Sequence, residues 1–189
     1  NNAKTIKGQK YKVMTAILYL APAKISGFNV CPHADDCALT CLNTAGRGKM
    51  NTVQKGRINK TLWYFKERHT FMAQLHKEIK SHIKRCKIKG FKPAFRINGT
   101  SDLKVENMGL IQKYPMAQWY DYTKNPIRMK KFIDGKMPSN YHLTFSLGST
   151  NKIDAQKVLK LGGSVATVFR NKKLPKKFMD HRVFNADQS

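Results

Sequence analysis

The feature that most constrains the fold is a repeat of short apolar segments, each followed directly by a polar turn. Four of them lie in the second half of the chain, with central residues 25, 23 and 24 positions apart. They are Pro93 to Ile97, Gln118 to Tyr122, Tyr141 to Phe145 and Ser164 to Phe169. A similar segment, Lys12 to Leu20, lies near the start of the chain. Their length and their β-branched and aromatic residues predict strands.

The segments between these strands predict helices. Short helical patterns run from Met108 to Tyr114, Pro126 to Ile133 and Lys152 to Leu161. A longer pattern runs from Ile58 to Lys87, with an apolar stripe from Phe65 to Cys86 that predicts a core position for Cys86. Strands alternating with helices predict an α/β fold, either a parallel sheet or a partial β/α barrel. We expect one domain over residues 1–189, with residues 1–10 and 170–189 irregular or part of a larger chain.

Three of the four cysteines fall in one segment after the first predicted strand. Cys31, Cys37 and Cys41 form the pattern C-x5-C-x3-C. A helix from Cys37 to Leu42 would place Cys37 and Cys41 on one face, while Pro32 keeps Cys31 in a loop. Thiolates are the ligands that iron–sulfur clusters and zinc prefer. Four cysteines in 189 residues are too few for a disulfide scaffold, so we expect a reducing cytoplasm.

Polar residues gather just after each predicted strand. They are Asn98 to Asp102, Thr123 to Asn125 and Ser146 to Ser149. Because the carboxyl ends of parallel strands share one edge, where such folds bind ligands, we expect these residues and the cysteines to lie together. Asp102, Asp121 and Tyr122 are candidates for contact with a cofactor or substrate. Asp102 is equally typical of a turn cap, and strand alternation favours packing for Tyr120 and Tyr122.

The charge of the chain points to a polyanionic partner. Lysine and arginine number 36 and aspartate and glutamate 11, a net charge of +25 spread along the sequence. Such a surface favours nucleic acid, DNA or RNA, as partner. Trp63, Trp119 and Tyr122 are candidates for stacking on bases. No apolar run approaches the roughly 20 residues that span a bilayer, and we expect no membrane partner.

Five sequence blocks resemble the phage gene-product-88 family. The blocks are A-P-A-K-I-S-G-F-N-V-C-P (21–32), C-L-N-T-A-G-R-G (41–48), R-I-N-G-T-S-D (96–102), Y-D-Y-T-K-N-P (120–126) and N-Y-H-L-T-F-S (140–146). They reach from the first predicted strand to the third of the four repeats. The resemblance implies a viral protein in the host cytoplasm, with a viral or host protein complex among its possible partners. It implies no chemistry.

The order of strand, three-cysteine loop, helix, strand and glycine-containing turn is also similar to the radical S-adenosylmethionine enzymes. That resemblance implies a [4Fe-4S] cluster on Cys31, Cys37 and Cys41. It implies S-adenosyl-L-methionine beside the cluster, with Ser146 at its ribose and its amine at the turn of Asn98, Gly99, Thr100, Ser101 and Asp102. The chain departs from that pattern: the usual spacing is C-x3-C-x2-C, Thr40 replaces an aromatic residue, and Asn-Gly-Thr replaces Gly-Gly-Glu.

Three hypotheses follow. The first is an iron–sulfur enzyme that acts on or with nucleic acid. The second is a non-catalytic nucleic-acid-binding protein with a structural metal, zinc or iron–sulfur, whose fourth ligand is His33 or Cys86. The third has no metal, with three reduced cysteines packed in a viral takeover or assembly factor.

Overall fold

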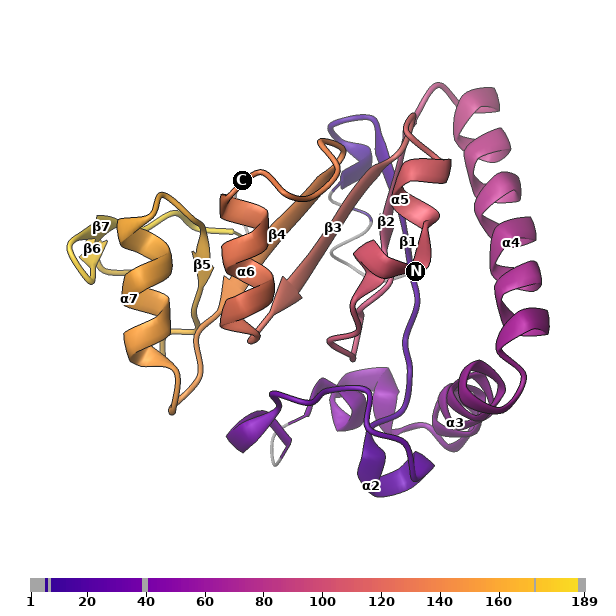
Figure 1. The fold of residues 1–189 in the computed structure, drawn as a ribbon, viewed down its shortest axis with the longest axis horizontal. Coiled ribbons are helices and arrows are strands. Elements are labelled where there is room, and N and C mark those ends of the chain that lie inside the picture. Colours follow the sequence, from indigo (N-terminus) through magenta and orange to yellow (C-terminus); the bar gives the residue numbers. More distant parts are fainter. Residues whose placement is uncertain (1–5, 7, 39–40, 172, 187–189) are drawn as a thin grey trace.

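The structure is a computed structural model that describes residue 6 and residues 8–38, 41–171 and 173–186. Its centre is a five-stranded, fully parallel sheet in the order β1-β2-β3-β4-β5 (Figure 1). The strands are β1 (Val13–Ile17), β2 (Lys92–Arg96), β3 (Gln118–Thr123), β4 (Tyr141–Ser146) and β5 (Val165–Ala166). Because strand order equals sequence order and parallel crossovers are right-handed, the connecting helices fall on one face.

The described helices vary widely in length. They are α2 (Ala23–Ser26), α3 (Asn51–Lys66), α4 (Arg68–Ile88), α5 (Leu110–Lys113), α6 (Pro126–Ile133) and α7 (Lys152–Lys160). Four 3-10 turns complete the connections: η1 (Asp35–Ala38), η2 (Leu42–Thr44), η3 (Gly46–Lys49) and η4 (Val105–Met108). An antiparallel hairpin of β6 (Lys177–Phe178) and β7 (His181–Arg182) follows the sheet. In Figure 1, α2, α3 and the cysteine segment lie below the carboxyl edge of the sheet.

One hydrophobic core lies between the helices and one face of the sheet. Alternate strand residues supply the sheet side, and α4, α5, α6 and α7 supply the other. The sheet side includes Phe95, Trp119, Tyr141, Leu143 and Phe145; the helix side includes Phe71, Leu75, Ile79, Leu110, Met129 and Val158. The paired register brings Phe95, Trp119 and Tyr141 side by side across three strands. Burying such side chains contributes about 1.5–3 kcal/mol each relative to exposure.

The single long helix predicted over Ile58 to Lys87 is wrong, because two helices meet there. The chain leaves helical geometry at Glu67, where φ is −133° and ψ is 55°. The break resets the phase of the apolar stripe, so Phe65 and His69 are exposed. The buried face of α4 is instead Phe71, Leu75, Ile79, His82 and Cys86. The core position predicted for Cys86 is confirmed, since it is 0% exposed.

The repeat of strands and helices is confirmed. Every predicted strand is present, although the last is only two residues long, and α6 has the predicted bounds. The structure is therefore an α/β fold with a parallel sheet; closure into a partial barrel is not established by it. The helix predicted from Cys37 to Leu42 is replaced by η1 and η2 in the described part, while residues 39 and 40 lie outside the description. Residues 170–189 are not wholly irregular, because β6 and β7 pair within them.

Candidate functional site

The cysteine loop is docked against the turn that follows β2. The backbone N–H of Asp102 donates to the carbonyl of Val30 at 2.8 Å, and the Cys31 Sγ lies 3.7 Å from the carbonyl oxygen of Thr100. Val30 itself is fully buried. The Asn29 side chain accepts from the Cys31 N–H at 3.0 Å, which shapes the loop locally. These contacts place Cys31 at the carboxyl edge of the sheet, as the sequence predicts.

The far end of the cysteine segment is anchored by Asn43, which is 0% exposed. Arg57 of α3 donates to the Asn43 side-chain oxygen at 2.8 Å and to its carbonyl at 3.0 Å. Gln54 exchanges hydrogen bonds with Asn43 and also donates to the carbonyl of Gly48. Gly48 packs so closely on the Asn43 carbonyl that a Cβ there would overlap it. Sequence analysis missed this anchor, although Asn43 and Gly48 lie in one of the family-like blocks.

The three thiols are brought into one neighbourhood by this double anchoring. Burial, together with the nearby Asp102, Cys41 and Cys37, raises the pKa of the Cys31 thiol to about 12. Cys31 and Cys41 are partly buried and Cys37 is exposed. The raised pKa keeps Cys31 protonated at neutral pH, which disfavours a free nucleophilic thiolate. A bound cation would reverse this preference, because metal binding displaces the thiol protons.

The described side chains do not form a preassembled metal site. Within residues that the structure describes, no three histidine, cysteine, aspartate or glutamate side chains are arranged to hold a metal ion. The donor set nevertheless fits an iron–sulfur cluster, because three soft thiols lie on one loop next to an edge of the sheet. The metal ligands Cys31, Cys37 and Cys41 therefore stay a prediction.

The turn after β2 is held by its own polar side chains. Thr100 donates to the carbonyl of Leu20 at 2.6 Å, and Ser101 donates to the Asn98 side chain at 2.8 Å. Asn98 in turn donates to the Leu103 carbonyl at 2.9 Å. Gly99 continues the ladder to β1, and a Cβ there would lie 2.6 Å from the carbonyl oxygen of Leu18. These contacts give the turn a structural role, and its contact with a cofactor stays a prediction.

A buried cluster of charged side chains lies next to the turn after β2. Arg128 of α6 is 2% exposed and pairs with Asp102 and with Glu106, both at 2.8 Å. The second oxygen of Asp102 accepts from the Thr123 hydroxyl and the Lys124 N–H. One arginine thus ties together the segments that follow β2 and β3. Asp102 caps and braces these segments, in line with its turn-cap interpretation.

Asp121, in β3, is buried near the carboxyl edge of the sheet and does not reach the surface. It is 2% exposed and accepts from the Asn98 N–H at 2.9 Å and from the Tyr141 hydroxyl at 3.2 Å. Burial raises its pKa to about 7, while the Asn98 N–H and the charges of Arg128 and Arg96 oppose the rise. A buried carboxyl with a raised pKa close to a candidate cofactor site is typical of functional edges, but the partners of Asp121 are all structural here.

The remaining candidate ligands separate in space. Ser146 ends β4 at the carboxyl edge, where its carbonyl accepts from Asn151. Cys86 lies near the end of α4, and its carbonyl accepts from Phe91 just before β2, at the amino edge of the sheet. Its Sγ is 3.5 Å from the His82 Nε2. The structure therefore removes Cys86 as a fourth ligand and leaves His33, which is on the cysteine loop.

The aromatic residues proposed for stacking divide between the two faces of the sheet. Trp119 is 1% exposed and stacks on Phe95 inside the core. Trp63 donates to Thr70 and meets Phe71 edge to face. Tyr122, by contrast, is 37% exposed, and the Arg96 guanidinium lies 4.7 Å from the centre of its ring. Neither Tyr120 nor Tyr122 belongs to the hydrophobic core. Tyr120 is half-buried, in line with the packing expected of it, whereas the packing expected of Tyr122 is wrong.

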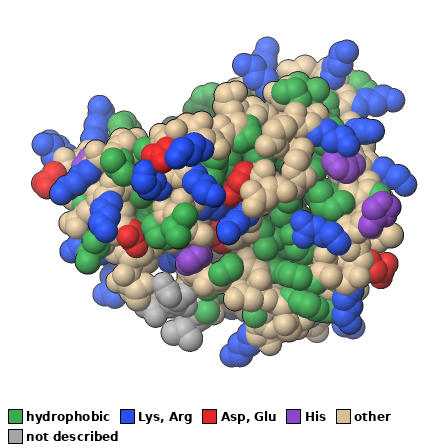
Figure 2. All heavy atoms as spheres, viewed as in Figure 1, with side chains coloured by type: hydrophobic (Ala, Val, Ile, Leu, Met, Phe, Trp, Pro, Cys, Tyr) green, Lys and Arg blue, Asp and Glu red, His purple; other side chains and the backbone are tan. Residues whose placement is uncertain are grey.

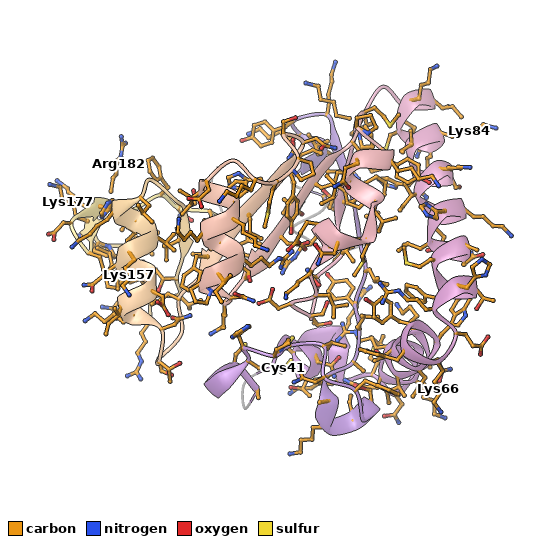
Figure 3. All side chains as sticks on the ribbon, in the orientation of Figure 1. Cys41, Lys66, Lys84, Lys157, Lys177 and Arg182 are labelled. Atoms are coloured by element: carbon orange, nitrogen blue, oxygen red, sulfur yellow. The ribbon has the colours of Figure 1, made fainter. Side chains whose placement is uncertain are left out.

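Positive charge is spread over the face of the molecule that Figure 2 shows. Figure 2 shows lysine and arginine side chains around the whole outline of one face, with few acidic ones between them. On α4, Lys77, Lys80, Lys84 and Lys87 are all exposed, opposite the buried face. Figure 3 shows Lys84 at one end of the molecule, far from Cys41, with Lys157, Lys177 and Arg182 at the other side. The positive charge is thus not confined to one element.

Two open hollows lie away from the cysteine loop. One, of about 620 Å³, is lined by residues 169–171 and 173–176, and the other, of about 470 Å³, lies near the amino ends of β3 and β4. Neither is lined by a cysteine or by the turn after β2. No helix among the described residues is both long and apolar enough to cross a membrane.

One known protein family matches this sequence. The sequence model described as "Gene product 88" matches residues 1–188. The chain belongs to the gene product 88 family. This confirms the resemblance seen in the five sequence blocks and fits a bacteriophage origin. No curated protein and no solved structure matched the chain. The gene product 88 family thus supplies a relationship but no activity, and the function is argued from the site.

Proposed function

We propose that this member of the gene product 88 family is an iron–sulfur protein that acts on or with nucleic acid. The observation that carries the proposal is the docking of the cysteine loop on the turn after β2, beside the carboxyl edge of a parallel sheet. Cys31, Cys37 and Cys41 are the proposed ligands. Three thiolates suit a [4Fe-4S] cluster and leave one iron without a protein ligand, since Cys86 lies at the opposite edge.

The residues around the cysteines would hold the cluster and its cofactor in place. The partly buried Cys31 and the anchor at Asn43 hold the two ends of the loop, and Cys37 between them is exposed. S-adenosyl-L-methionine is the proposed ligand of the open iron, and its cleavage by one electron from the reduced cluster would supply a radical for hydrogen abstraction. Asn98, Gly99, Thr100, Ser101, Asp102 and Ser146 are the proposed contacts. The hydrogen bonds within the turn keep its backbone rigid beside that position.

Nucleic acid is the proposed partner because of charge. A net charge of +25 on 189 residues attracts polyanions at long range. All four cysteines are free, which suits the reducing cytoplasm of a host cell, the proposed location. A viral or host protein complex is compatible with the same surface.

The test is anaerobic purification followed by iron, sulfide and zinc analysis and an absorption spectrum. We expect about four irons and four sulfides per chain, with a broad band that bleaches on reduction. Cys37→Ala should lose the metal and lower the thermal stability together, because cluster binding is coupled to folding. Cys86→Ala is the matched control and should keep the iron. A Cys37→Ala protein with full iron content would overturn the proposed ligands.

A second candidate is a non-catalytic nucleic-acid-binding protein with a structural metal. The observation in its favour is that the polar side chains of Asn98, Thr100 and Ser101 already bond within the protein. His33 would then be the fourth ligand, with zinc as the alternative metal. One zinc without iron, lost in His33→Ala, would select this candidate.

A further inference from the structure

The parallel sheet carries two unlike faces, and the second one is polar and aromatic. Strand alternation sends Phe95, Trp119 and Tyr141 to the helices. It sends Arg96, Tyr120 and Tyr122 to the other face. Parallel sheets are usually apolar on both faces because helices cover both. Here α4, α5, α6 and α7 all pack on the first face, so the second face needs another explanation.

The aromatic side chains on this second face are held in place. The Arg96 guanidinium lies 4.7 Å from the Tyr122 ring centre and donates to the carbonyl of Asn98 at 3.1 Å. Tyr120 is half-buried, and its hydroxyl lies near Thr15 on β1. Tyr122 is nonetheless 37% exposed, which is high for an aromatic residue inside a central strand. A planar ring and a planar guanidinium are thus presented together on a rigid support.

Charge on this face is complementary to a polyanion. Arg96 supplies a cation, and Lys124, two residues after Tyr122, has its ammonium group against Gly148 in the turn after β4. The nearby acidic side chains do not add negative charge to this second face, because each is paired or buried elsewhere. Asp102 and Glu106 pair with Arg128, and Asp121 is buried toward the helices.

We propose that this second face, defined by Arg96, Tyr120, Tyr122 and Lys124, binds single-stranded nucleic acid by stacking bases on its aromatic side chains. The inference rests on the proposed function and names the form of nucleic acid and the surface. Unpaired bases stack on tyrosine rings and on arginine planes, and cations beside them meet the phosphates. In a duplex the base faces are stacked on one another and cannot reach the tyrosine rings. This surface therefore binds single-stranded nucleic acid in preference to the duplex. The bound strand would reach the carboxyl edge, next to the cysteine loop.

The experiment measures fluorescence anisotropy with a labelled 12-nucleotide single strand of mixed sequence, as RNA and as DNA, and with the matching duplex. We expect the wild type to bind a single strand more tightly than the duplex. Tyr122→Ala should weaken single-strand binding by about tenfold, in the range found for one stacked base. Tyr122→Phe should bind within about twofold of the wild type, because the ring remains.

Phe184→Ala is the matched control, because Phe184 is also an exposed aromatic residue with an arginine, Arg182, over its ring at 5.0 Å. It lies beyond the hairpin of β6 and β7, and its removal should leave affinity unchanged. Circular dichroism and thermal melting of each variant exclude misfolding as the cause.

The outcomes separate this inference from the proposed function. If the wild type binds single strands and Tyr122→Ala binds equally well, the second face is not the site and this inference fails alone. Preference for the duplex, or an equal loss in Phe184→Ala, would also overturn it. If the wild type binds no nucleic acid at all, the nucleic-acid part of the proposed function fails with it, while the iron analysis still tests the cluster.

Discussion

At the scale of single residues, small and polar positions decide how the carboxyl edge is built. Gly99 allows the chain after β2 to pass against the backbone of Leu18, and Gly48 does the same against Asn43. Asn98 donates two hydrogen bonds to the Asp121 carboxylate in the interior, one from its backbone N–H and one from its side chain. None of these residues belongs to an apolar pattern, so hydrophobic periodicity does not identify them. Sequence analysis selected Asn98 to Asp102 as ligands, and the structure shows first that they hold the turn.

Gly99→Ala should destabilise the protein by about 1–3 kcal/mol, because the added Cβ would lie 2.6 Å from the Leu18 carbonyl oxygen in a place without room. Urea unfolding gives the free energy difference. The matched control is Gly56→Ala in α3, where no atom lies within 4 Å of the added Cβ. That change should stabilise the helix by roughly 0.5–1 kcal/mol. Equal effects of the two changes would contradict the close packing at Gly99.

Asp121 predicts a pH dependence of stability. Burial raises its folded-state pKa to about 7, above the unfolded value, so the folded state retains a proton that the unfolded state has lost. Stability should therefore fall as the pH rises from about 4 to about 7, with a slope of up to about 1.4 kcal/mol per pH unit from this group. Comparing urea unfolding of wild type and Asp121→Asn across that range isolates the contribution, because the other titrating groups are shared. Parallel curves for the two proteins would refute it.

At the scale of elements, the connections between strands carry both the fold and the site. Helix α6 begins at Pro126 with its amino end capped by Asn125, which accepts from the Arg128 N–H at 3.1 Å. The same helix places the Arg128 side chain under the turn after β2. Its position was predictable from Pro126 and the apolar pattern, but the pairing of Arg128 with Asp102 and Glu106 was not. Those partners are 26 and 22 residues away, and only the packing of α6 on the sheet brings them together.

Arg128→Met should cost about 3–5 kcal/mol of stability, because it leaves Asp102 and Glu106 partly buried without their cation. Lys130→Met is the control on the same helix: Lys130 pairs with Asp134 at 2.9 Å but is 65% exposed. An exposed i,i+4 pair contributes only about 0.3–0.5 kcal/mol, so that change should be nearly silent in thermal melting. Similar losses in both variants would show that the Arg128 cluster is not the brace inferred here.

At the scale of the whole molecule, charge and architecture act on different surfaces. The lysine row of α4 lies on the helix side, whereas Arg96 and Tyr122 lie on the second face of the sheet. Positive charge on either side of the molecule raises the association rate of a polyanion. Only groups that contact the bound polyanion lower its dissociation rate.

Replacing Lys77, Lys80, Lys84 and Lys87 with glutamine should therefore lower the association rate for a single strand several-fold at low salt. The dissociation rate should stay the same, and the difference in association should vanish near 0.5 M salt as screening shortens the reach of the charges. Stopped-flow measurement over a salt series checks both rates. Faster dissociation would place α4 in contact with the nucleic acid.

The sequence by itself determined the order of strands and helices, the parallel sheet and the edge on which the cysteine loop lies. These follow from local information, because apolar alternation, β-branched residues and turn residues lie close together in the chain. The tertiary structure alone decided the break at Glu67, the Arg128 cluster and the exposure of Tyr122. Each of these depends on which face of an element meets a distant segment, and strand alternation cannot say which of two faces the helices will cover.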